Sequence, residues 1–173
     1  DFIVNKYDLY QLSTGEVLRN EIKNETELGK EISSIINSGT LVSDDIVKKL
    51  VENFISDNIY KDRLIFDGYP RNLIQAKNLD YLLKKYDQNI NIVLKLSVSL
   101  DTIKKRISER KDLEKRVDDS REIAIKRFET YENNIKPVID FYENSNLLKV
   151  VNGEASISEI SSEISRLIES NKG

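Results

Sequence analysis

The chain has 173 residues, of which 39% are hydrophobic and 33% are charged, and its net charge is -3. This length fits one domain, and the apolar content is too high for a disordered chain. The sequence contains no cysteine and no histidine, which excludes disulfides, thiolate nucleophiles, cysteine zinc sites and an imidazole base. Any catalysis must therefore use carboxylates, hydroxyls, lysine, arginine, backbone amides or an oxygen-bound metal.

Charge and hydropathy also bear on the partners of the chain. The net charge is slightly negative, so no overall basic field points to nucleic acid. The sequence has neither an apolar run of about 18 residues nor a signal-peptide pattern. We therefore expect a soluble, cytoplasmic protein that binds no nucleic acid and no membrane.

Short apolar runs alternate with helical periods along the chain. Residues 1–7 read as the end of an amphipathic helix, and four runs predict strands, over 9–12, 64–66, 92–96 and 147–151. Strands that alternate with helices are typical of a parallel sheet covered on both faces. Because ligands of such sheets bind outside the carboxyl ends of the strands, we expect the chemistry in the loops that follow these runs.

Three helices begin with recognisable capping signals. Ser43 precedes two aspartates and an apolar helical period, so it is a candidate N-cap. Asn72 with Gln75, and Ser156 with Glu159, resemble capping boxes, and the second pair has the proper Ser-x-x-Glu form.

The strongest motif is segment 64–76, Leu-Ile-Phe-Asp-Gly-Tyr-Pro-Arg-Asn-Leu-Ile-Gln-Ala. A buried strand runs into Asp67, and Gly68 lets the backbone approach a ligand. Pro70 fixes the loop, and Arg71 stands just before a helix. Taken alone, the segment is equally compatible with an ordinary strand-to-helix turn and a solvated arginine.

Two other loops have a related arrangement. Segment 11–19, Gln-Leu-Ser-Thr-Gly-Glu-Val-Leu-Arg, also follows a strand and opens a helix, and Ser13 or Thr14 would serve simply as its N-cap. Segment 39–44, Gly-Thr-Leu-Val-Ser-Asp, exposes two apolar residues before a capped helix, which a turn with a hydrophobic staple would also explain.

A fourth signal is a series of arginines. Lysine is the default surface cation of this chain, with eighteen lysines against nine arginines. Arginine is favoured where a planar, forked group must recognise phosphate, although a charged helical face with Arg–Asp pairs is the alternative. Six of the nine arginines fall in these motifs: Arg19, Arg71, Arg106, Arg110, Arg116 and Arg127.

In this order and spacing the four signals resemble the adenylate kinase family of nucleoside-monophosphate kinases. The resemblance extends from residues 1–7 to residues 151–153. It implies a P-loop NTPase-like α/β sandwich in three layers, forming one domain over 1–173. Within that domain it implies AMP-binding helices at about 13–42 and a short lid at about 110–116.

The beginning of the chain is a further point of that resemblance. Residues 1–7 resemble the helix that directly follows the family's Gly-x-x-x-x-Gly-Lys phosphate loop. We therefore expect that loop, and the central first strand before it, to be missing from this chain. We also expect this 173-residue chain to be inactive by itself, because neighbouring strands would lose their ladder partner.

The resemblance implies reversible phosphoryl transfer from ATP to AMP, giving two ADP, in a cytoplasmic monomer that uses Mg²⁺ with ATP. It places Asp67 near Mg²⁺ through water. The catalytic set that it implies is Arg71, Arg110, Arg116 and Arg127. The AMP-binding set is Thr14, Arg19, Thr40, Leu41, Val42, Gly68, Tyr69, Pro70, Arg71, Gln75, Arg116 and Arg127. The ATP-binding set is Arg106, Arg110 and Ala155.

The lid and the nucleobase leave alternatives open. Only residues 111–115 separate Arg110 from Arg116, which resembles the short-lid branch, although lysines replace the usual glycines beside the lid. Thr14 and Gln75 favour AMP, whereas Asn72 is common in UMP/CMP kinases. A UMP/CMP kinase is one alternative, and a non-catalytic nucleotide-binding module that lost its phosphate loop naturally is another.

Overall fold

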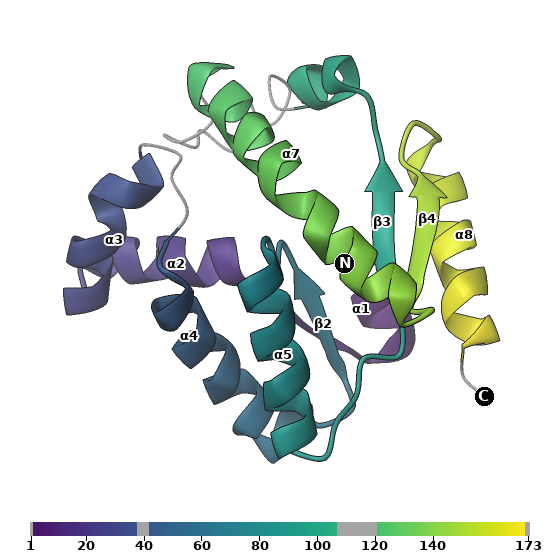
Figure 1. The fold of residues 1–173 in the computed structure, drawn as a ribbon, viewed down its shortest axis with the longest axis horizontal. Coiled ribbons are helices and arrows are strands. Elements are labelled where there is room, and N and C mark those ends of the chain that lie inside the picture. Colours follow the sequence, from purple (N-terminus) through teal and green to yellow (C-terminus); the bar gives the residue numbers. More distant parts are fainter. Residues whose placement is uncertain (1, 38–41, 107–120, 172–173) are drawn as a thin grey trace.

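The computed structural model describes residues 2–37, 42–106 and 121–171 (Figure 1). Residues 100–106 are also helical. The other elements follow in chain order: α1 (Phe2–Tyr7), β1 (Tyr10–Ser13), α2 (Thr14–Lys23), α3 (Glu27–Asn37), α4 (Asp44–Ser56), the 3-10 helix η1 (Asn58–Tyr60), β2 (Leu64–Asp67), α5 (Leu73–Lys85), β3 (Val93–Ser97), α7 (Arg121–Asn144), β4 (Leu148–Asn152) and α8 (Ile157–Ser170).

All four expected strands are present, and their bounds differ from the expected ones by no more than one residue. They pair in parallel, as expected for this class. β1 pairs with β2 from Tyr10–Leu64 to Ser13–Asp67, and β3 pairs with β4. In the described part of the chain no ladder joins β2 to β3, so the strands form two separate pairs. The arrows of β2, β3 and β4 in Figure 1 nevertheless all point toward the upper side of the view.

Helices flank the strands and divide the core into two clusters. The larger cluster joins β1 and β2 to α2, α3, α4 and α5 through buried residues such as Leu12, Ile32 and Val51. The smaller cluster joins α5 to α7 through Ala76, Val138 and Tyr142, with β3 and β4 packed against it. α8 packs against β4 and α1. The structure is therefore an α/β arrangement of parallel strands flanked by helices, in agreement with the sequence prediction.

The capping predictions are confirmed in different degrees. Ser156 and Glu159 form a complete capping box at the start of α8. Asn72 caps α5 by accepting from the Gln75 backbone N–H at 2.8 Å. The Gln75 side chain, however, accepts from the N–H of Arg71 at 2.8 Å, one residue before the N-cap. Ser43 is the N-cap residue of α4 but makes no side-chain capping bond.

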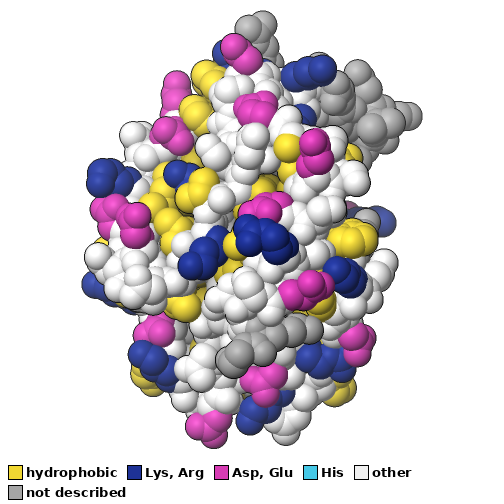
Figure 2. All heavy atoms as spheres, turned by 90° about the vertical axis from the view of Figure 1, so that its right-hand side faces the viewer, with side chains coloured by type: hydrophobic (Ala, Val, Ile, Leu, Met, Phe, Trp, Pro, Cys, Tyr) yellow, Lys and Arg dark blue, Asp and Glu magenta, His cyan; other side chains and the backbone are white. Residues whose placement is uncertain are grey.

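The surface of the described residues has no marked preference for one sign of charge on the face that α8 and β4 dominate. Figure 2 shows Lys and Arg side chains interspersed there with Asp and Glu. Among the described residues, no helix has the length and apolar character needed to cross a membrane.

Candidate nucleotide-binding site

The site begins where β1 and β2 end side by side. Ser13 and Asp67 are the last paired residues of the two strands. Thr14 then opens α2 with only 4% of its surface exposed, and Gly68 turns the chain away from β2 with a φ of 68°. A residue with a Cβ is strained at such a positive φ. The local backbone therefore brings two loops together at the carboxyl ends of the strands, where ligands of parallel sheets bind.

Two arginines converge above this point. A Cβ built on Gly15 would lie 3.2 Å from Nη1 of Arg19 and 3.8 Å from Nη2 of Arg71. The Nε of Arg71 donates to the carbonyl oxygen of Gly68 at 2.6 Å, which fixes the plane of its guanidinium group. Two guanidinium groups that converge on one point can together bind and neutralise an oxyanion placed there. The pair is thus suited to bind a phosphate group.

The loop that carries Arg71 is anchored from behind by Tyr69. The Tyr69 side chain is buried, and its hydroxyl donates to the carbonyl oxygen of Gln75 at 3.2 Å. Burial, and secondarily the nearby charge of Asp44, raises the pKa of Tyr69, so the hydroxyl remains a donor at neutral pH. This hydrogen bond ties the loop to the first turn of α5.

Gln75 connects this loop to α4. Its side chain is 3% exposed, and its Oε1 accepts from the backbone N–H of Arg71 at 2.8 Å. Its Nε2 donates to Oδ1 of Asp44 at 2.8 Å. The same oxygen of Asp44 accepts from Nδ2 of Asn72 at 2.9 Å. Side chains from two helices and one loop thereby form a connected hydrogen-bond network.

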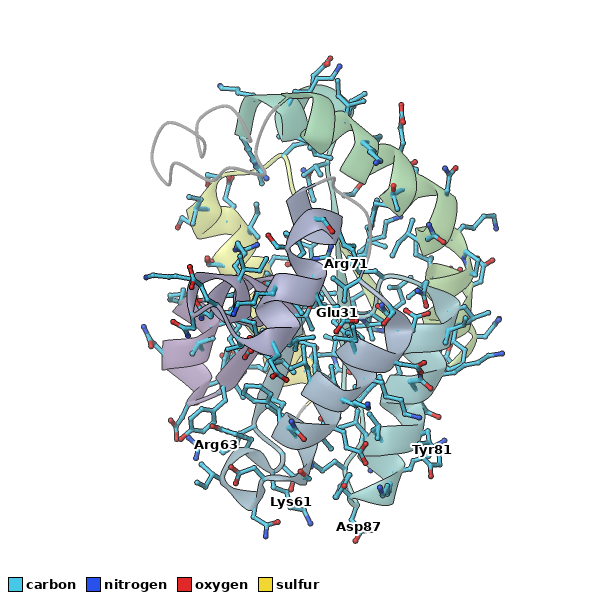
Figure 3. The ribbon with its side chains drawn as sticks, turned by 90° about the vertical axis from the view of Figure 1, so that its left-hand side faces the viewer. Glu31, Lys61, Arg63, Arg71, Tyr81 and Asp87 are labelled. Atoms are coloured by element: carbon cyan, nitrogen blue, oxygen red, sulfur yellow. The ribbon has the colours of Figure 1, made fainter. Side chains whose placement is uncertain are left out.

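A cleft of about 760 Å³ lies over these residues and extends to β3 and α7. Figure 3 shows Arg71 near the middle of the molecule, far from Lys61, Arg63 and Asp87 at its lower end. Leu18, Ile36 and Val47 add apolar surface to the cleft. The structure brings nine of the predicted site residues together in its lining: Thr14, Arg19, Val42, Asp67, Gly68, Tyr69, Pro70, Arg71 and Gln75.

Asp67 is the predicted metal residue, and its environment fits a weakly held Mg²⁺. The carboxylate is exposed at the end of β2, and its Oδ2 accepts from Nε2 of Gln11 at 2.9 Å. Within the described ranges no three acidic side chains cluster to form a protein-only metal cage. Mg²⁺ commonly uses one or two carboxylates together with water and substrate phosphates, so a single exposed Asp67 is compatible with that ion.

The two described residues of the predicted ATP-binding set, Arg106 and Ala155, lie outside this cleft lining. Nη2 of Arg106 donates to the carbonyl oxygen of Gly153 at 2.7 Å. The carboxylate of Glu154 accepts from the N–H of Ser99 and the hydroxyl of Thr102, both at 2.5 Å. These bonds lower the pKa of Glu154, and the bond from Thr102 has the largest effect. They also join the turn after β4 to the start of the helical residues 100–106.

The remaining predicted site residues fall outside the part of the chain that the structure describes. Thr40, Leu41, Arg110 and Arg116 lie outside the described residues, as does the segment expected to form the lid. Arg127 belongs to α7, but its side chain is also outside the described part of the structure.

The structure also adds residues that sequence reasoning missed. The sequence indicates for Asp44 only a place in the first turn of a helix, yet in the structure it accepts hydrogen bonds from two side chains at the start of α5. Glu154 is not among the predicted site residues, although it lies next to Ala155 of the predicted ATP-binding set. No local pattern signals either role, because both depend on contacts between distant segments.

Fold and site together define an α/β protein with a cleft at the carboxyl ends of its strands that is suited to bind a phosphate group. The family model for adenylate kinase matches residues 1–147. The chain is 38% identical over 192 aligned positions to the adenylate kinase of Pelagibacter ubique (strain HTCC1062), covering 96% of this chain and 90% of that one. It is 36% identical over 169 positions to the adenylate kinase of Flavobacterium psychrophilum, with coverages of 97% and 89%. The chain belongs to the adenylate kinase family, as its motifs predicted.

Proposed function

We propose that this protein transfers a phosphoryl group reversibly from ATP to AMP, giving two molecules of ADP. The observation that carries the proposal is the convergence of the Arg19 and Arg71 guanidinium groups above Gly15, within the same cleft as the buried amide of Gln75. The pair suits the phosphate of a monophosphate, and the amide with its apolar surroundings suits the base.

The proposed chemistry needs no general base, which agrees with a chain that has no histidine. The phosphate of AMP is already ionised at neutral pH, so one of its oxygens attacks the γ-phosphorus of ATP directly. A new P–O bond forms to AMP while the bond to the β-phosphate oxygen breaks, and ADP leaves. Arg19 and Arg71 would hold the attacking phosphate in line and neutralise its charge.

The donor side of the reaction uses the region near β4. We propose that Arg106 and the backbone at Ala155 contact ATP, and that Arg110, Arg116 and Arg127 act at the transferring phosphoryl group. Asp67 would hold Mg²⁺ through water. That ion, when bound, neutralises charge on the nucleotide phosphates. A short lid over about 110–116 would exclude water from the reaction.

AMP is the acceptor that the cleft supports best. Thr14 and Gln75 both line it, together with the apolar side chain of Val42. Asn72 is the residue that favoured UMP or CMP in the sequence. Its side chain caps α5 and donates a hydrogen bond to Asp44. That structural use accounts for Asn72 whichever base is bound, so it no longer favours a pyrimidine.

The test is a coupled assay of ADP formation with the full-length natural protein, ATP, Mg²⁺ and each of AMP, CMP and UMP. We expect the highest kcat/KM with AMP. Faster turnover with CMP or UMP would contradict the choice of acceptor. Binding of nucleotide without ADP formation from any acceptor would contradict the kinase and favour a non-catalytic binding module.

A further inference from the structure

Asp44 lies behind the cleft and makes two hydrogen bonds that no catalytic role requires. It is a half-buried residue of the first turn of α4. Its Oδ1 accepts from Nε2 of Gln75 at 2.8 Å and from Nδ2 of Asn72 at 2.9 Å. Gln75 lines the cleft, whereas Asp44 is not part of its lining. Of the two side chains bonded to Asp44, Gln75 is the one that lines the cleft, so Asp44 can act on a ligand through it.

A carboxylate restricts the orientation of a neighbouring amide. Ionised Asp44 can only accept hydrogen bonds, so the NH₂ group of Gln75 must face it. On its other side Gln75 meets the backbone N–H of Arg71, which can only donate, and Oε1 accepts from it at 2.8 Å. Turning the amide over would set donor against donor and acceptor against acceptor. Both neighbours thus select the same orientation.

This orientation determines what Gln75 still offers to a ligand. After these two bonds Oε1 keeps one lone pair and Nε2 keeps one hydrogen. The acceptor Oε1 beside the donor Nε2 complements a base edge on which an amino group lies next to an unprotonated ring nitrogen. Adenine has such an edge. A 6-oxopurine presents the reverse arrangement, a carbonyl oxygen next to a ring N–H, and leaves both groups of Gln75 unsatisfied.

We propose that Asp44 is a positioning residue that fixes the amide orientation of Gln75 and thereby makes the cleft select a 6-aminopurine monophosphate over a 6-oxopurine one. This inference rests on the proposed function, in which Gln75 meets the purine of the acceptor nucleotide. Without Asp44, the backbone N–H of Arg71 is the only partner that the described residues provide for the Gln75 amide, so the amide can turn over to meet the wrong base.

The experiment measures kcat/KM for AMP and for IMP, and their binding by calorimetry, in the full-length natural protein and in Asp44→Ala. We expect the AMP-to-IMP ratio to fall about tenfold, the loss that one charge-assisted hydrogen bond accounts for. The KM for ATP should not change. A general loosening of the fold would weaken AMP and IMP alike and leave their ratio unchanged.

Two further variants complete the design. Asp45→Ala removes the neighbouring carboxylate, which is exposed in the same turn, and should keep the wild-type ratio. Asp44→Asn retains an acceptor oxygen without the charge, so the ratio should fall only about two- to threefold. This milder variant, compared with Asp45→Asn, decides the question if Asp44→Ala does not fold.

The outcomes distinguish a failure of the Asp44 positioning role from a failure of the proposed function. If wild-type protein prefers AMP but Asp44 variants keep the ratio of the matching Asp45 variants, the positioning role is wrong and the proposed function stands. If wild-type protein phosphorylates neither AMP nor IMP, the proposed function itself fails.

Discussion

The β1–β2 half of the molecule and the β3–β4 half hold their polar side chains by different means. In the first half Arg71, Gln75 and Tyr69 are joined by bonds that include three backbone groups, and Gln75 and Tyr69 are buried. In the second half an exposed carboxylate, Glu154, connects the turn after β4 to residues 99–102. The first network also includes the half-buried carboxylate of Asp44, but its other bonds join amide, hydroxyl, guanidinium and backbone groups that do not titrate near neutral pH. The contact in the second half depends on the Glu154 carboxylate and weakens when that group is protonated.

The two halves also differ in what surrounds these bonds. The first half rests on the larger core cluster, in which four helices pack around two strands. The second half rests on the smaller cluster that α7 forms with α5. We therefore expect the proposed monophosphate side to be rigid before ligand binds and the proposed ATP side to depend more on solution conditions. The predictions below test this difference.

The largest expected effect is that of Arg71→Lys. Lysine keeps the charge, but it cannot bond the Gly68 carbonyl and grip a phosphate with a planar fork at the same time. The KM for AMP should rise roughly a hundredfold while the KM for ATP stays constant, as steady-state kinetics would show. Arg166→Lys is the matched control, because Arg166 forms an exposed ion pair with Glu163 on α8. A twofold change or less in AMP affinity would remove Arg71 from the site.

Gly15→Ala should separate stability from binding in the same half. Gly15 is a residue of α2, and alanine in a helix is favoured over glycine by up to about 1 kcal/mol. The new Cβ would lie 3.2 Å from Nη1 of Arg19, so that flexible side chain must move. Urea unfolding should show equal or higher stability, while AMP titration shows about tenfold weaker binding. Unchanged AMP affinity would mean that the position of Arg19 is unimportant.

Glu154→Gln tests the second half through pH. The folded state holds the pKa of Glu154 below its ordinary 4.5, first through the bond from Thr102 and then through that from Ser99. A depressed carboxyl pKa stabilises the fold above the unfolded pKa and loses this contribution as pH falls through the folded pKa. The wild type should therefore unfold at a higher temperature than the variant at pH 7, and the difference should vanish in acid.

A control for that series is Glu143→Gln, an exposed glutamate near the end of α7. It should change the melting temperature little at either pH. If the difference in melting temperature between wild type and Glu154→Gln stays constant from neutral pH to well below 4.5, the Glu154 side chain does not stabilise the fold through its charge.

The smallest expected effect is that of Tyr142→Phe, at the cluster where α7 meets α5. The hydroxyl of Tyr142 is buried and has no hydrogen-bond partner among the described residues. Its removal should leave the free energy of unfolding unchanged or raise it by up to about 1 kcal/mol. Tyr69→Phe is the contrast, because it loses the bond to the Gln75 carbonyl and should cost about 1 kcal/mol in chemical denaturation. Equal losses in both variants would show that Tyr142 has a partner.

The sequence by itself determined the strands, the helix starts and the region of the site. Apolar periodicity placed β1 to β4 within one residue, and the Ser156–Glu159 capping box formed as its spacing predicted. Such signals are local, because periods and caps involve residues only a few positions apart. The motif containing Arg71 and Gln75 resembled the adenylate kinase family only together with the three other signals, and the comparisons with known proteins confirm that family.

Only the tertiary structure decided how these pieces meet. The contact between Asp44 and Gln75 joins residues 31 positions apart, and the bond between Glu154 and Ser99 spans 55. Even within the Asn72 cap, the Gln75 side chain turned to the N–H of Arg71 rather than to that of Asn72 itself. Pairings of this kind depend on how helices pack against the strands, and a buried amide takes whichever partners that packing places beside it.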